Sequence, residues 1–159
     1  MANQYLNPLF YQLYGEKFNY YRFDHRMEMQ KSVYLLQDMG VPVGGYSFRW
    51  YQHGPYSQRL QDDMFEGKNS TETNMEFFED YTGRIEKLRD VIGSKKKGHY
   101  SVSQWMECIA SLRYLRTKVL RYNASVKQVV DALEAEKKHM DDNQINMAAY
   151  EQMEALFKV

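Results

Sequence analysis

Apolar residues recur at helical spacing along most of this chain, and the resulting stripes predict most of its structure. Over residues 25–39, Met29, Val33 and Leu36 recur at i, i+4 and i+7, which predicts a helix with one buried face that ends at Gly40. Comparable stripes predict five more helices, which bury Tyr56, Leu60 and Met64; Phe77, Tyr81, Ile85, Leu88 and Ile92; Trp105, Ile109, Leu112, Leu115 and Val119; Val129, Val130 and Leu133; and, from about Asn146, Tyr150, Met153 and Phe157.

The helical period stops between residues 46 and 52, where the sequence reads Tyr-Ser-Phe-Arg-Trp-Tyr-Gln. Its aromatic content and partial alternation predict a short strand, as one part of a small β-hairpin. His53-Gly54-Pro55 follows and predicts a turn, after which Pro55 is expected to open the next helix.

Capping-box spacing indicates where three of the helices begin. The boxes pair Thr73 with Glu76, Ser101 with Gln104, and Ser125 with Gln128. The helix that begins at Ser101 is expected to extend to about Tyr122.

Together these elements predict a mostly α (α+β) fold, a compact helical domain of six or seven helices with a small β-hairpin, winged-helix-like in outline. Residues 1–23 are crowded with aromatic rings and are expected to form an arm with a short helix that stops near Gly15. So many rings are costly to leave in water, so we expect this arm to pack on the body or on a partner. Residues 24–159 form the single helical domain of this prediction.

Composition limits the environment and the partners. Lys plus Arg and Asp plus Glu each number 21, so no chain-wide field attracts nucleic acid or an acidic membrane. Cys108 is the single cysteine, no signal-peptide pattern appears in residues 1–10, and no apolar run approaches the roughly 20 residues that span a bilayer. We therefore expect a cytoplasmic protein that does not enter a membrane.

The sequence shows no catalytic set, so we expect no enzyme activity, no catalytic residue, no cofactor and no metal. Cys108 lies within the apolar face of a predicted helix and is expected to be a buried, unreactive thiol. The four histidines, at positions 25, 53, 99 and 139, lack metal-ligand spacing, although a site assembled in space stays open. We expect the target to meet the outer surface rather than an inner cleft.

Two groups of residues are candidates for binding. The turn segment can display four side chains to a protein partner, although turn chemistry alone also explains its glycine and proline: Arg49, Tyr51, His53 and Tyr56. The basic residues favour phosphate contacts as an alternative to simple solubility and helix-end charge: Lys95, Lys96, Lys97, Arg113 and Arg116.

A family resemblance narrows these options. The resemblance is to the YwgA-like family of bacterial and archaeal proteins and runs from about Asp24 to Phe157. It rests on residues 28–37 (Glu-Met-Gln-Lys-Ser-Val-Tyr-Leu-Leu-Gln), residues 44–57 (ending Arg-Trp-Tyr-Gln-His-Gly-Pro-Tyr-Ser), residues 105–115 and the predicted helix over residues 129–137. That family is similar to the Panacea (SocA-like) antitoxin domain, which shares a Tyr-Leu helix followed by a turn with His-Gly-Pro. The resemblance implies a helical domain with a small hairpin and a non-enzymatic role as an antitoxin, or beside toxin, phage and defence functions.

The leading hypothesis is therefore a non-enzymatic protein-interaction module, antitoxin-like or associated with phage defence, that acts by binding a partner protein. The alternative is a winged-helix-like nucleic-acid-binding regulator, with residues 46–53 as the wing and Lys95 to Lys97 on phosphate. A weaker alternative is an enzyme whose site is assembled from residues scattered in the sequence. A homodimer is compatible with each of them.

Overall fold

A computed structural model describes residues 3–121 and 123–158 of the chain. In these residues it contains seven α-helices, two short strands and three short helical turns, which confirms the mostly helical α+β fold with a small hairpin. In chain order the elements are α1 (Leu6–Tyr14), α2 (Phe23–Asp38), β1 (Arg49–Tyr51), β2 (Gly54–Tyr56), α3 (Gln58–Glu66), the 3₁₀ turn η1 (Glu76–Tyr81), α4 (Thr82–Ile92), the 3₁₀ turn η2 (Lys95–Lys97), α5 (Val102–Tyr114), the π-helical turn η3 (Leu115–Val119), α6 (Val126–Glu136) and α7 (Asn143–Leu156).

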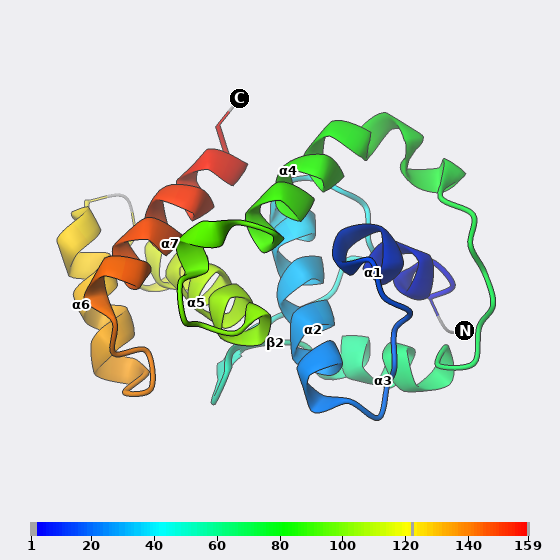
Figure 1. Cartoon of the computed structure of the whole chain (residues 1–159), viewed down its shortest axis with the longest axis horizontal. Helices are drawn as coiled ribbons and strands as arrows, with labels where there is room; N and C mark the ends of the chain where they lie inside the picture. The colour runs from blue at the N-terminus through cyan, green and yellow to red at the C-terminus, as the bar shows by residue number, and fades with distance from the viewer. Residues whose placement is uncertain (1–2, 122, 159) are drawn as a thin grey trace.

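Helices α2 and α5 pack against each other at the centre, and the other helices surround them (Figure 1). The prediction that α2 buries a single face is wrong, because the helix is buried continuously over residues 27–36. This buried stretch includes the polar side chains of Glu28, Gln30 and Lys31. A helix covered on every side buries its polar positions too, and each of these groups must then find a partner within the protein.

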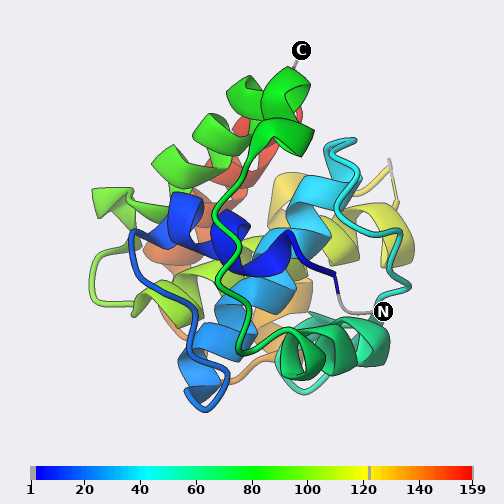
Figure 2. The same ribbon diagram turned by 90° about the vertical axis from the view of Figure 1, so that its right-hand side faces the viewer.

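The N-terminal segment contributes to the same core as the rest of the chain. Leu6, Leu9 and Phe10 of α1 are fully buried, and α1 packs against α4. Figure 2 shows α1 in dark blue, crossed by the segment that connects α3 to η1. The side-chain amide of Asn7 donates to the Gly67 carbonyl in this segment at 3.1 Å. Met1 and Ala2, at the start of the predicted arm, and Val159, at the end of the predicted domain, lie outside the described residues.

The hairpin corrects the prediction for residues 46–55. Strands β1 and β2 pair antiparallel, with Trp50 opposite Pro55 and Tyr51 opposite Gly54. Gln52 and His53 therefore form the hairpin turn, and Pro55 lies in a strand instead of opening a helix. Proline is tolerated there because this two-stranded sheet has only edge strands. Helix α3 begins after Ser57, whose side chain accepts a hydrogen bond from the Leu60 amide.

The helix starts agree with the capping predictions at two places and differ at one. The capping boxes at Ser101 and Ser125 are both formed. The box predicted at Thr73 is absent, because the Glu72 carboxylate accepts the backbone amide of Thr73 at 3.1 Å and fixes a local turn. The expected end near Tyr122 falls on a residue outside the described part of the chain.

Candidate functional site

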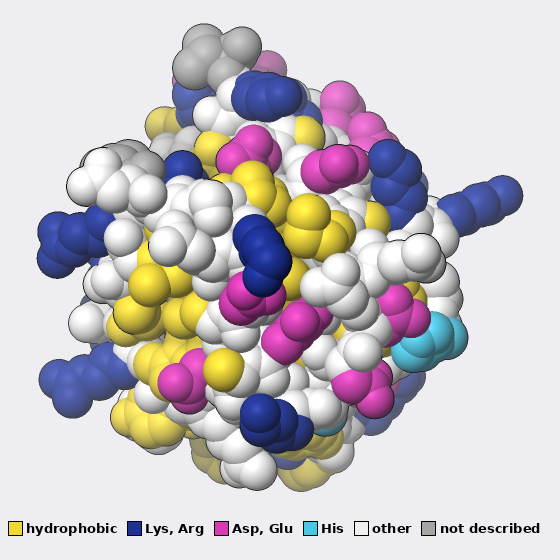
Figure 3. All heavy atoms as spheres, turned by 90° about the vertical axis from the view of Figure 1, so that its left-hand side faces the viewer, with side chains coloured by type: hydrophobic (Ala, Val, Ile, Leu, Met, Phe, Trp, Pro, Cys, Tyr) yellow, Lys and Arg dark blue, Asp and Glu magenta, His cyan; other side chains and the backbone are white. Residues whose placement is uncertain are grey.

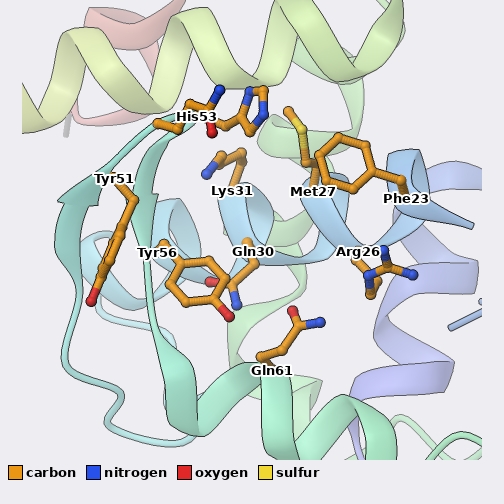
Figure 4. Close-up of a pocket in the computed structure, with 10 residues that line it drawn as sticks. Phe23, Arg26, Met27, Gln30, Lys31, Tyr51, His53, Tyr56 and Gln61 are labelled. Carbon is orange, nitrogen blue, oxygen red and sulfur yellow. The ribbon is translucent and has the colours of Figure 1, made fainter.

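The hairpin, α2 and α3 enclose a pocket of about 290 Å³ (Figure 4). Aromatic rings form part of its wall: Phe23 from the start of α2, and Tyr51 and Tyr56 from the two strands. The Tyr51 and Tyr56 rings pack edge to face, with centroids 5.1 Å apart. Paired rings on adjacent strands hold each other in place, so the pocket has a fixed aromatic wall.

Two buried side chains of α2 attach the hairpin to the helical body. The Gln30 amide donates to the Ser57 carbonyl at 2.8 Å and accepts the Ser57 N–H at 2.9 Å. The Lys31 ammonium donates to the Pro55 carbonyl at 2.7 Å. Burial lowers the pKa of Lys31 to about 7. These bonds explain why α2 carries polar residues where apolar ones would pack equally well.

A cluster of ionisable groups lies beside this pocket, centred on Glu107 of α5. Its carboxylate is buried and lies 2.9 Å from His139 Nε2, 3.5 Å from His53 Nδ1 and 4.0 Å from Lys137 Nζ. The Lys137 ammonium also donates to the carbonyls of Tyr51, at 2.9 Å, and Gln52, so it fixes the hairpin turn. Burial lowers the pKa of Lys137.

This cluster borders a second hollow of about 500 Å³, which shares His53 and Phe23 with the first. A site at a hollow is therefore available besides the outer surface, and the expectation that a target meets the outer surface stays a prediction. Buried, convergent ionisable groups lie next to a hollow that solvent reaches, because α5, the hairpin turn and the α6–α7 connection meet at one place.

Three of the four residues predicted for partner binding line the first pocket, namely Tyr51, His53 and Tyr56. Arg49 lies outside this pocket and borders an adjacent hollow on the other side of the two tyrosines. The hairpin therefore presents the predicted side chains over two neighbouring depressions.

The basic residues of the nucleic-acid alternative lie at opposite ends of α5. Lys95 to Lys97 precede its first turn, whereas Arg113 lies in its last turn, on the order of 15 Å further along the axis. Arg113 donates to Asp38 at 2.6 Å, and Arg116 donates to the Ala124 carbonyl. On the face shown in Figure 3, basic and acidic side chains are interspersed.

Sequence reasoning missed the carboxylate and the lysines of the site. Glu107 falls in the apolar stripe of α5, whereas Lys31 and Lys137 have polar neighbours in the sequence, and all three side chains are buried in the fold. For Glu107, the available signal was a charged residue inside an apolar stripe. The spacing of residues in the sequence does not show which distant residues such a side chain contacts. Cys108 has no part in the cluster, because its thiol donates to Asn146 at 3.4 Å and burial raises its pKa.

Comparison of the chain with models of protein families, with curated proteins and with solved structures gives no match. What the structure defines is a mostly helical α+β domain with a hairpin that closes a pocket against its central helix. In the described residues, every helix is too short or too polar to cross a bilayer.

Proposed function

We propose that this chain is a non-enzymatic protein-interaction module, antitoxin-like or defence-associated, that binds an acidic segment of a partner protein in the pocket between the hairpin and α2. One observation carries the proposal: the pocket combines aromatic walls with the basic side chains of Arg26 and Lys31, and no carboxylate is among its described lining residues. The resemblance to YwgA-like and Panacea proteins supports the same class of function.

The rim of the pocket has the composition of an interface. Phe23 and Tyr51 are both about half exposed. The Arg26 guanidinium lies over the rings of Phe23, at 5.7 Å, and Tyr20, at 5.3 Å, and it donates to the Tyr20 carbonyl. Tyrosine and arginine are enriched among the residues that contribute most to binding energy. A tyrosine ring buries a large surface at a small entropic cost.

The size and charge of the pocket favour a short acidic segment. A volume of about 290 Å³ is at the lower end of the range for small-molecule sites, and it matches one or two side chains of a partner. Lys31 uses one of its donors on Pro55, and Arg26 uses one on Tyr20. Both retain further N–H groups that can donate to a carboxylate.

The proposal is tested by co-purification of the tagged chain from its native cells, with quantification of any stoichiometric partner. Tyr51→Ala and Arg26→Gln are expected to reduce recovery of that partner at least about tenfold, the effect of losing about 1.4 kcal/mol. Tyr11→Ala is the matched control, because Tyr11 is an exposed ring on α1, outside this pocket.

Two results contradict the proposal. One is recovery of the chain without a partner; the other is a partner whose recovery Tyr51→Ala leaves unchanged. Recovery of nucleic acid that is lost steeply as salt rises supports the winged-helix-like alternative instead.

A further inference from the structure

We propose that His53, Glu107 and His139 form a binding site for one divalent transition-metal ion of the zinc class, with a fourth coordination position that faces the hollow between the hairpin turn and α5. The site goes beyond the proposed protein interaction, and its test uses the purified chain and metal ions only. Its ligands come from three parts of the fold: the hairpin turn, α5 and the α6–α7 connection.

The geometry of the three side chains fits a single ion. One donor atom from each residue lies within 4.8 Å of the other two. Zinc holds imidazole and carboxylate donors at about 2.0–2.2 Å, so donors in a tetrahedral site are about 3.3 Å apart. His139 Nε2 and His53 Nδ1 lie 2.9 and 3.5 Å from the Glu107 carboxylate. Because no pair of donors is more than 4.8 Å apart, the widest pair must close by at most about 1.5 Å to surround an ion.

The state of His53 is a second, independent observation. Its Nδ1 atom is buried and has no hydrogen-bond partner among the described residues, although it is turned toward Glu107. A buried polar atom without a partner is costly, and such atoms are rare in folded proteins. Coordination of an ion by Nδ1 satisfies this atom.

The donor set determines the class of ion. Two imidazoles and one carboxylate are the ligands of open zinc sites, in which the fourth position holds water or an exogenous ligand. Imidazole suits zinc, copper, iron and nickel, whereas magnesium and calcium prefer oxygen ligands alone. We therefore expect zinc and cobalt to bind and magnesium not to compete.

Access and local charge are consistent with such a site. Glu107 and His139 both border the hollow of about 500 Å³, and His139 is about half exposed, which gives an ion a path from solvent. Lys137 is the nearest cation, but its Nζ is 4.0 Å from the carboxylate, further away than either imidazole nitrogen. Its ammonium is directed to the carbonyls of the hairpin turn.

The experiment is titration of the full chain, freed of metal by a chelator, with Zn²⁺ in a calorimeter and with Co²⁺ followed by visible absorption. We expect one ion per chain, the absorption of four-coordinate cobalt, and no displacement by a large excess of Mg²⁺. His139→Asn is expected to weaken binding at least about tenfold. Its side chain is half exposed, so the variant should fold, which circular dichroism checks.

His99→Asn is the matched control, because His99 also contacts a carboxylate, Asp142 at 2.9 Å, but lies away from the cluster. This variant is expected to bind zinc as the natural sequence does. The proposal is overturned if the chain binds no zinc, if His139→Asn binds it unchanged, or if His99→Asn weakens it equally.

Discussion

Buried ionisable side chains are the main residue-scale feature of this protein. Glu28, Lys31, Glu107 and Lys137 are all almost inaccessible to solvent. A buried charge is costly unless other groups compensate it, so these positions are difficult to explain by packing alone. Three of them connect the hairpin to the helical body or belong to the cluster centred on Glu107, whereas Glu28 faces the N-terminal segment and α5.

Glu28 gives a prediction for the pH dependence of stability. Burial raises its pKa to about 7, although Ser103 donates to its carboxylate at 2.6 Å. Between pH 4.5 and 7 the folded state therefore binds more protons than the unfolded state, and the free energy of unfolding falls as pH rises. At most about 3 kcal/mol is lost across this window. Glu28→Gln should flatten the profile and stabilise the fold at pH 8.

Urea unfolding of both proteins from pH 5 to 8 measures this effect. Glu86→Gln is the control, since Glu86 is exposed on α4 and should leave the profile unchanged. Asp24, Arg22 and Glu16 also act on Glu28, so their charges must be retained in every variant. A Glu28→Gln protein with the same pH profile as the natural sequence would contradict the assignment.

At the same scale, sequence reasoning identified the residues of the hairpin but not the ionisable residues that lie beside them. Tyr51, His53 and Tyr56 were predicted because a turn displays its side chains. Glu107 and His139 were not connected to them, because the three ionisable residues are separated by more than thirty positions each. Only the packing of α5 against the hairpin brings them together.

At the scale of elements, helices were predicted better than the hairpin. Periodicity identified α5 and α6, and their capping boxes fixed where they begin. A small hairpin was predicted, but its second strand was assigned to a turn and a helix start, because Gly54 and Pro55 are residue types depleted in strands. The register depends on contacts with α2 and α5, which the local sequence does not encode.

A substitution at Gly54 tests how the hairpin packs against α5. The φ of Gly54 is +89°, and a Cβ atom there would collide with the Ser111 hydroxyl of α5. Gly54→Ala should lower the free energy of unfolding by about 1–3 kcal/mol, through backbone strain and overpacking. Thermal or urea unfolding measures the change.

A second substitution separates the two causes. Ser111→Ala removes the colliding hydroxyl, which is buried without a partner among the described residues, so alone it should be close to neutral. Combined with Gly54→Ala, it should restore the part of the stability lost to the collision, but not the part lost to backbone strain at positive φ. Strictly additive effects of the two changes would contradict the predicted contact.

At the scale of the whole molecule, α2 and α5 form a central pair on which the hairpin closes. The mostly helical fold with a small hairpin followed from the hydrophobic periods. The two hollows could not be predicted from these periods, because they form where segments distant in sequence meet. The pocket proposed to bind the partner and the cluster of His53, Glu107 and His139 therefore both lie at the hairpin turn.

The most direct test of the proposed function is photo-cross-linking in the native cells, with a photoreactive phenylalanine in place of Tyr51 or of Tyr11. Both rings are exposed, but only Tyr51 lines the pocket. We expect one cross-linked partner protein at position 51, absent at position 11, with an acidic segment at the point of attachment. The same product from both positions, or none from position 51, would contradict the proposal.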